Sequence, residues 1–208
     1  LGGDAPSGRI RVIHEGVRSI YAPAARPARD HVEFLFVGRR DPYKNLPMLI
    51  EALDAVRQQG LPVRLRIVGG DDPRYPEARE TADRLGLNQY ITWSGYVSEA
   101  ELIAAYQQTD VFVLPSRYEG FGLPVLEAMA CGTPVICSNT SSLPEVAGDA
   151  AVLIDPAQPA SLIDAMAQLA RDPILRSDLS RNGLRHAATF TWEKTARETL
   201  ACYEEIKQ

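Results

Sequence analysis

Residues 111–137, VFVLPSRYEGFGLPVLEAMACGTPVIC, contain two short apolar runs that are separated by a loop and a helical pattern. The runs Val111–Leu114 and Pro134–Cys137 are apolar at nearly every position, which is typical of strands covered on both faces. The helical pattern extends over 122–131, and Pro124 suits its first turn. A strand, a helix and a second strand in this order favour a right-handed crossover, so the stretch predicts a parallel sheet.

The same alternation of strand and helix continues from about residue 31 to the C-terminus. Further strands are expected at Val32–Val37, Val63–Val68, Tyr90–Trp93 and Ala151–Ile154. Further helices are expected at 46–59, 75–86, 99–108, 142–147, 159–171, 173–188 and 192–207. The sequence therefore predicts an α/β fold, a single Rossmann-like, doubly wound parallel sheet of about six strands with helices on both faces.

Three local signals indicate where helices begin. Asn45 is expected to cap the helix at 46–59. Two serines stand three residues before a glutamate, the spacing of a capping box: Ser98 with Glu101, and Ser142 with Glu145.

Residues 1–30 differ in composition from the rest. Arg9–Ile13 is expected to form one short strand, and the Pro- and Ala-rich stretch 22–27 is typical of an interdomain linker. The chain also starts with Leu, which favours the cut end of a longer protein. We therefore expect a linker with the end of a missing N-terminal domain at 1–30, and one Rossmann-like domain at 31–208.

Composition excludes several classes of protein. A formal net charge of -5 argues against a nucleic-acid partner, because phosphate-backbone binding needs clustered Lys and Arg. The three cysteines have no histidine at a zinc-ligand spacing, so we expect buried thiols in a reducing compartment and no metal site. No stretch approaches the ~20 apolar residues of a membrane span.

The unusual residues collect where the predicted strands end. The exit segments are 38–40, 69–72, 95–97, 115–120 and 138–140, and they hold glycines, cations, hydroxyls and a carboxylate. The opposite edge of the sheet offers only turn residues. Because open parallel sheets bind ligands at the carboxyl ends of their strands, we predict a ligand site at this edge.

The loop and helix after Leu114 carry the strongest signal. Gly120 and Gly122 would present free N–H groups at a helix N-terminus, which favours a phosphate. Glu127 lies in an otherwise apolar helix and, if buried, needs a partner. Placed in the first turn, it would be only ~6 Å of helix rise from the loop that holds Glu119, so both carboxylates could accept hydrogen bonds from sugar hydroxyls. Each feature also has a simpler explanation when it is taken alone. An acid in the first helical turn is ordinary helix-dipole chemistry, and Gly-Phe-Gly also fits a tight turn.

Several segments resemble a known family. EGFGLPVLEAMA at 119–130 resembles the double-glutamate motif of retaining glycosyltransferase family 4, which has the GT-B architecture of two Rossmann-like domains. VGRRDPYKN at 37–45 resembles its phosphate-contacting segment, and RVIHEGV at 11–17 the end of its N-terminal domain, although Arg18 stands where Asp is common. SLPEVAG at 142–148 is nearest to members that build cell-surface polysaccharides. The resemblance runs from about residue 9 to the C-terminus and implies the C-terminal half of a GT-B fold.

The resemblance also implies roles for residues. Arg39 and Lys44 would bind and stabilise the leaving diphosphate, and Glu119 would hold donor-sugar hydroxyls, which makes these three the catalytic candidates. Glu127 would bind the nucleotide ribose, and main-chain N–H groups of 121–123 would meet the phosphate and sugar. The full set of donor-binding candidates is Gly38, Gly69, Tyr96, Val97, Ser116, Gly120, Phe121, Gly122, Leu123 and Glu127, with Tyr96 and Val97 beside the base, Gly69 leaving room for it, and Ser116 donating to phosphate.

The implied reaction transfers a hexosyl unit from a UDP-, GDP- or ADP-sugar to a polysaccharide or glycolipid acceptor, with retention of configuration. Two cations and a helix N-terminus can stabilise the leaving group, so no metal or other cofactor is expected, and Asp71-Asp72 is interpreted as a loop or helix cap. The full-length protein would be cytoplasmic, and a peripheral position on the inner face of the cell membrane stays open.

Three other functions are alternatives to glycosyl transfer by this chain. The chain alone is expected to be inactive, which makes a binding-only module the first alternative. A sugar-nucleotide epimerase of the same architecture is the second. A dinucleotide-dependent oxidoreductase is disfavoured, because the first strand exit lacks Gly-x-Gly-x-x-Gly.

Overall fold

The computed structural model describes residues 10–206, which contain one six-stranded parallel sheet of order β3-β2-β1-β4-β5-β6. The strands are β1 (Val32–Val37), β2 (Val63–Val68), β3 (Ile91–Gly95), β4 (Val111–Leu114), β5 (Val135–Ser138) and β6 (Val152–Ile154). The order reverses between β1 and β4, as in the Rossmann arrangement. The predicted Rossmann-like α/β fold is confirmed.

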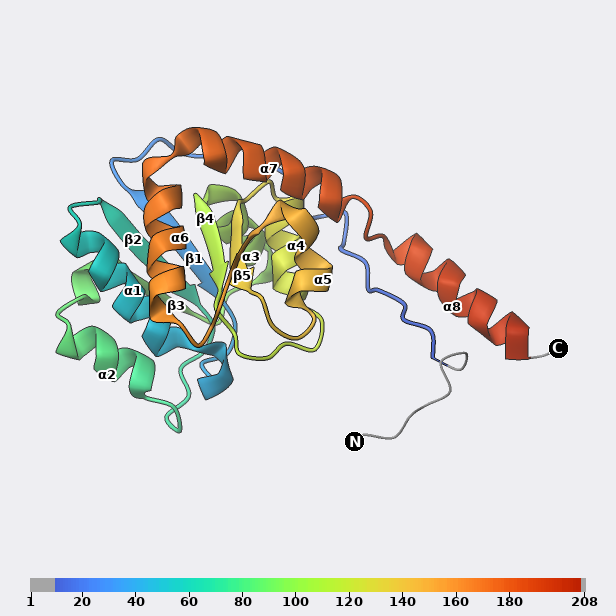
Figure 1. The fold of residues 1–208 in the computed structure, drawn as a ribbon, viewed down its shortest axis with the longest axis horizontal. Helices are drawn as coiled ribbons and strands as arrows, with labels where there is room; N and C mark the ends of the chain where they lie inside the picture. The colour runs from blue at the N-terminus through green and yellow to red at the C-terminus, as the bar shows by residue number, and fades with distance from the viewer. Residues whose placement is uncertain (1–9, 207–208) are drawn as a thin grey trace.

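Helices cover both faces of the sheet (Figure 1). One face carries α1 (Leu46–Gln58), which packs against α2 (Glu77–Arg84) and α6 (Pro159–Arg171). The other carries α4 (Leu123–Ala130), which packs against α3 (Glu99–Gln108), α5 (Leu143–Ala147) and α7 (Pro173–Ala187). The last helix is α8 (Trp192–Ile206), and the bounds of the elements differ from the predicted ones by at most two residues. No helix within the described residues has the length and apolar character needed to cross a membrane.

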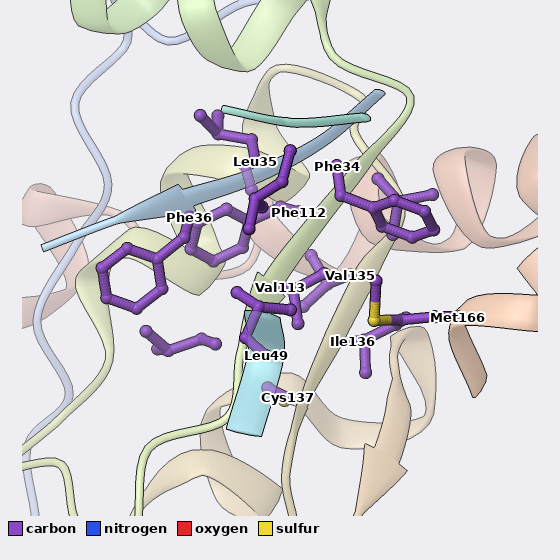
Figure 2. Close-up of a cluster of buried hydrophobic side chains, with 14 of the residues drawn as sticks. Phe34, Leu35, Phe36, Leu49, Phe112, Val113, Val135, Ile136, Cys137 and Met166 are labelled. Carbon is purple, nitrogen blue, oxygen red and sulfur yellow. The ribbon is translucent and has the colours of Figure 1, made fainter. Parts of the chain in front are cut away.

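The core lies on both sides of the central strands. Phe34, Leu35 and Phe36 of β1 are all fully buried, so no position in this part of the strand faces water. Figure 2 shows these side chains with residues of β4 and β5, with Leu49 of α1 and Met166 of α6. The absence of polar alternation in the sequence follows from this two-sided burial.

Only one of the three predicted cap interactions forms. Ser98 and Glu101 make the predicted capping box at the start of α3. Asn45 stands at the N-cap of α1, but its φ of 60° turns the side chain away, and its Nδ2 donates to the carbonyl of Pro156 at 3.1 Å. The predicted N-cap position of Asn45 is confirmed, but Oδ1 accepts no cap hydrogen bond, because the left-handed backbone and the bond from Nδ2 to Pro156 orient the side chain elsewhere.

The predicted capping box of Ser142 and Glu145 is also wrong. The Ser142 hydroxyl donates instead to the carbonyl oxygens of Glu119 and Phe121, at 3.1 and 2.8 Å. The Glu145 carboxylate meets Nε2 of His14 at 2.7 Å. The Ser142 side chain is oriented toward carbonyl oxygens of the loop before α4, so its hydroxyl stabilises that loop and does not cap α5.

The predicted strand at Arg9–Ile13 does not form within the described residues, which exclude residue 9. Residues 10–13 run along α8 and away from the sheet, so they lack a neighbouring strand (Figure 1). Nη2 of Arg11 lies 2.8 Å from Oε1 of Glu205, and the Thr195 hydroxyl donates to the carbonyl of His14 at 2.6 Å. Helix α8 and this segment therefore project together from the sheet domain.

Candidate functional site

An ion pair joins the two strand exits at the point where the strand order reverses. Lys44 ends the short 3-10 helix Pro42–Lys44 after β1, and Glu119 lies in the loop after β4. Nζ of Lys44 lies 2.6 Å from Oε1 of Glu119, and the two side chains are only 11% and 12% exposed. The amide of Arg117 also donates to the carbonyl of Tyr43 at 2.7 Å. Both groups therefore stand in the crevice where open α/β sheets bind ligands.

The two arginines after β1 have different surroundings. The Arg39 side chain is 71% exposed, and its Nε lies 3.1 Å from Asp41. The Arg40 side chain is 2% exposed, forms an ion pair with Asp71 and lies 4.5 Å from the centre of the Trp93 ring. Arg39 is thus accessible to a ligand. Arg40 is buried, and its charge is used in contacts within the protein.

The two aspartates after β2 also pair with arginine. Asp71 contacts Arg79 at 2.8 Å in addition to Arg40, and Asp72 binds Arg74 at 2.7 Å. Across residues 10–206 no group of three or more His, Cys, Asp or Glu is arranged to hold a metal ion.

The glycine-rich loop leaves its amides free. Ser141 and Ser142 bind the amide of Glu119 and the carbonyls of Glu119 and Phe121. The next amides, at 120–123, donate no hydrogen bond within the described part of the chain. Gly122 is the N-cap of α4 and has a φ of 110°, a conformation that few other residues adopt, and Pro124 follows in the first turn. Free amides at a helix N-terminus form a suitable site for a phosphate.

Phe121 anchors this loop from the other side. Its ring lies 6.0 Å from that of His14 and 6.4 Å from that of Phe190. His14 and Phe190 were not identified from the sequence, because no motif connects residues so far apart in the chain. The contacts connect the loop to the segment before β1 and to the start of α8.

Glu127 is the fifth residue of α4 and lies in its second turn, not in the first as predicted. Its expected partner is the hydroxyl of Tyr106 on α3, which donates to Oε2 at 2.9 Å. Burial raises the pKa of Glu127, and the hydrogen bond from Tyr106 works against that rise. Tyr106 was missed because an aromatic residue in a core helix has no distinguishing signal.

The other donor-binding candidates border the exits of β2 to β4. Tyr96 is 86% exposed and its ring lies against Gly70, while Val97 is half-buried. A Cβ on Gly69, which has a φ of 142°, would collide with the carbonyl of Gly38. The absence of a side chain at Gly69 therefore lets the exit of β2 approach that of β1. The Ser116 hydroxyl is fully buried and has no partner within residues 10–206, so it is not accessible as a phosphate donor in this state.

A separate cavity of about 540 Å³ lies where α7, α8 and the segment before β1 meet. Its lining includes Val17, Tyr21, Phe190 and Trp192, and none of the donor-binding candidates.

A parallel sheet in the order 3-2-1-4-5-6, with paired charges and free helix amides at its switch point, defines a Rossmann-like ligand-binding domain. The family described as glycosyl transferases group 1 matches residues 21–186. The chain belongs to this family.

The similar proteins agree with that family. The chain is 36% identical over 179 residues to O-antigen chain mannosyltransferase B of Escherichia coli, covering 82% of this chain and 45% of that protein. Sucrose-phosphate synthase from Thermosynechococcus elongatus is similar in structure, with a TM-score of 0.82, 29% identity, and 94% of this chain and 52% of that chain covered. The C-terminal domain of a group 1 glycosyl transferase from Francisella tularensis gives a TM-score of 0.74, 26% identity, and coverage of 84% and 97%. The chain spans about half the length of the first two proteins, and its structural neighbours are glycosyltransferases of GT-B architecture.

Proposed function

We propose that this chain binds the nucleotide-diphosphate-sugar donor of a retaining family 4 glycosyltransferase. The observation that carries the proposal is the Lys44–Glu119 pair at the switch point, next to the free amides of 120–123. A cation and helix amides match a diphosphate, and a carboxylate matches sugar hydroxyls. Retention of configuration is part of the proposal because the segment of Glu119 and Glu127 resembles the double-glutamate motif of that retaining family.

The transfer depends on stabilising the leaving group. The bond between the anomeric carbon and the diphosphate oxygen breaks, and its electron pair leaves on the diphosphate. The anomeric carbon forms a new bond to an acceptor oxygen, which loses its proton. Arg39, Lys44 and the N-terminus of α4 offset the charge that develops on the diphosphate, so we propose that the step needs no metal ion or other cofactor.

Donor binding would exchange partners within the site. Lys44 is neutralised by Glu119 in this structure. A diphosphate would draw the ammonium group toward itself, and the carboxylate would accept hydroxyl groups of the hexosyl unit. We assign Glu119 to sugar binding and not to covalent catalysis. Tyr96 and Val97 would border the base, and Glu127 would bind the ribose.

A second domain would supply the binding site for the acceptor. The chain spans about half the length of its relatives, so the acceptor site is assigned to the remaining half. Apolar side chains on the projecting segment, including Val12, Leu200 and Tyr203, are 56–67% exposed and suit contact with that half. By itself the chain would bind donor without transferring it. None of the relatives named above is an epimerase, so the comparisons give the epimerase alternative no support.

From the resemblance to enzymes of surface polysaccharides, we also propose that the full-length protein acts in the cytoplasm, where a peripheral position on the inner face of the cell membrane would suit such an acceptor. Its acceptor would be a polysaccharide or glycolipid.

Calorimetric titration with UDP, GDP and ADP, then with their sugar conjugates, tests the proposal. Saturable binding of one nucleotide is expected, and its loss in Lys44→Ala but not in Arg185→Ala would support the assigned site. Arg185 is an exposed cation on α7, distant in sequence from the strand exits. No binding of any nucleotide to the folded chain would contradict the proposal.

A further inference from the structure

The Tyr106 side chain is held in place by the core, independently of Glu127. It is fully buried, and its ring makes edge contacts with Phe112 of β4 at 5.5 Å and with Tyr21 at 6.0 Å. The carbonyl of the same residue accepts the Thr133 hydroxyl at 2.6 Å. The hydroxyl of Tyr106 is therefore a rigid donor at a fixed place.

Glu127 receives that donor on one oxygen only. Oε2 accepts from Tyr106 at 2.9 Å, whereas Oε1 accepts no short hydrogen bond within the described residues, and the Tyr21 hydroxyl is a more distant hydrogen-bond partner of the carboxylate. A second phenol, that of Tyr21, lies beside the same carboxylate, and burial together with the charge of Glu127 raises the pKa of Tyr21. Both phenols therefore stay protonated and are able to donate.

The other charges near Glu127 place it on the strand-exit side of the domain. Glu99 is the first residue of α3, directly after the exit of β3, and it pairs with Arg18. Both groups act on the charge of Glu127, Glu99 by repulsion and Arg18 by attraction. Cys131, at the end of α4, is buried beside it, and burial raises the pKa of its thiol to about 12, so the thiol carries no charge at neutral pH.

We propose that Tyr106, supported by Tyr21, is a positioning residue for Glu127, holding one carboxylate oxygen so that the other is presented to the vicinal hydroxyls of a nucleotide ribose. The inference rests on the proposed function. The hydrogen-bond partners of this half-buried carboxylate are phenols. Such an arrangement lowers the stability of the fold, because a phenol offsets the desolvation of a carboxylate less than a directly bound cation would. One oxygen that is firmly held and one without a short hydrogen bond suit a carboxylate that must accept hydroxyls from a ligand.

Tyr106→Phe tests the proposal, because it removes the hydroxyl and keeps the ring. The probes are the nucleoside diphosphate that the wild-type chain binds among UDP, GDP and ADP, and the 2′-deoxy form of the same nucleotide. In wild type the ribose form should bind more tightly than the deoxy form. Tyr106→Phe should weaken binding of the ribose form about three- to tenfold and leave the deoxy form nearly unchanged, as expected for loss of one hydrogen bond.

Three companion variants make the result specific. Glu127→Gln should reduce the ratio of deoxy to ribose dissociation constants, and adding Tyr106→Phe should not reduce it further. Tyr90→Phe, a change in a tyrosine that precedes β3 and stacks on Arg57, should leave the ratio at its wild-type value. If Tyr106→Phe does not fold, Tyr21→Phe replaces it and should change the ratio in the same direction.

The outcomes separate the two hypotheses. A folded Tyr106→Phe that weakens both nucleotides equally, or leaves the ratio unchanged, overturns the positioning role. An unchanged ratio in Glu127→Gln also overturns it, while nucleotide binding by the wild type leaves the proposed function standing. A wild-type chain that binds none of the three nucleotides overturns both.

Discussion

Two charged clusters stand at the same edge of the sheet, and they differ in how fully their groups are paired. The Trp93 cluster consists of Trp93, Arg40, Asp71 and Arg79, and the switch-point pair consists of Lys44 and Glu119. In the Trp93 cluster both guanidinium groups lie 4.5 Å from the ring centroid and both bind Asp71. Every charge there has a partner within the protein.

The switch-point pair is simpler and borders free hydrogen-bond donors. Lys44 and Glu119 have each other as ion-pair partners, and amides at 120–123 are unused within the described residues. A ligand could exchange with either member of this pair at little structural cost. A concentration of charge at strand exits therefore does not identify a site by itself, because what distinguishes a site is which charges are left able to change partner.

Replacing Lys44 by Ala is expected to have the largest effect. A charge-assisted contact to phosphate contributes roughly 1.5–3 kcal/mol, so affinity for the nucleoside diphosphate should fall by about that amount. Affinity for the nucleoside, which has no phosphate, should stay the same. Calorimetry with both ligands checks this, and equal weakening of the two would remove the phosphate assignment.

Replacing Arg40 and Arg39 separately by Ala contrasts the Trp93 cluster with a neighbouring exposed cation that belongs to neither cluster. Arg40→Ala removes a side chain packed on Trp93 and should lower the free energy of unfolding by about 1–2 kcal/mol. Arg39→Ala, at a position 71% exposed, should change it by less than about 0.5 kcal/mol but lower diphosphate affinity by about 1 kcal/mol. Urea unfolding and calorimetry measure both quantities. The reverse pattern would mean that Arg40 is the ligand cation.

The sheet was predictable from the sequence because its strands are buried on both faces. Phe34 to Phe36 are apolar at each position, and such runs separated by helical patterns have few other solutions. The Ser98 capping box was predictable because it depends on residues three apart. The same spacing did not predict a capping box correctly at Ser142, because its hydroxyl donates to carbonyl oxygens 21 and 23 residues away.

The site was predictable in outline and not in its contacts. The topology places the exits of β1 and β4 together, so residues 75 apart such as Lys44 and Glu119 could be expected at one edge. Their direct pairing could not, since it depends on side-chain conformation. Tyr106 had an indirect signal, because an acid in an apolar helix requires a donor, but the identity of that donor depends on how α3 packs on α4.

Replacing Glu119 by Gln tests whether the switch-point pair competes with ligand. Without the carboxylate, Lys44 is free to bind phosphate, so affinity for the nucleoside diphosphate should rise by at least about 0.5 kcal/mol, since even exposed pairs contribute up to about 1 kcal/mol and this one is mostly buried. Affinity for the nucleotide sugar should gain less or fall, because Gln accepts sugar hydroxyls less strongly. Calorimetry with the diphosphate and its sugar conjugate separates the two. A fall in affinity for the diphosphate would mean that Glu119 orients Lys44 and does not compete for it.

The smallest expected effect is that of Glu127→Gln on stability. Burial raises the pKa of Glu127 above its ordinary value of 4.5, so between that value and the raised one the unfolded chain ionises while the folded chain keeps the proton. Stability therefore falls as pH rises through this window, and at pH 7 the charged carboxylate lowers the free energy of unfolding. Glu127→Gln should remove this loss, so the variant should gain stability relative to wild type between pH 4 and pH 7, as measured by urea unfolding. A variant that loses stability at pH 7 would mean that the carboxylate stabilises the fold, which would weaken the case that it is kept for a ligand.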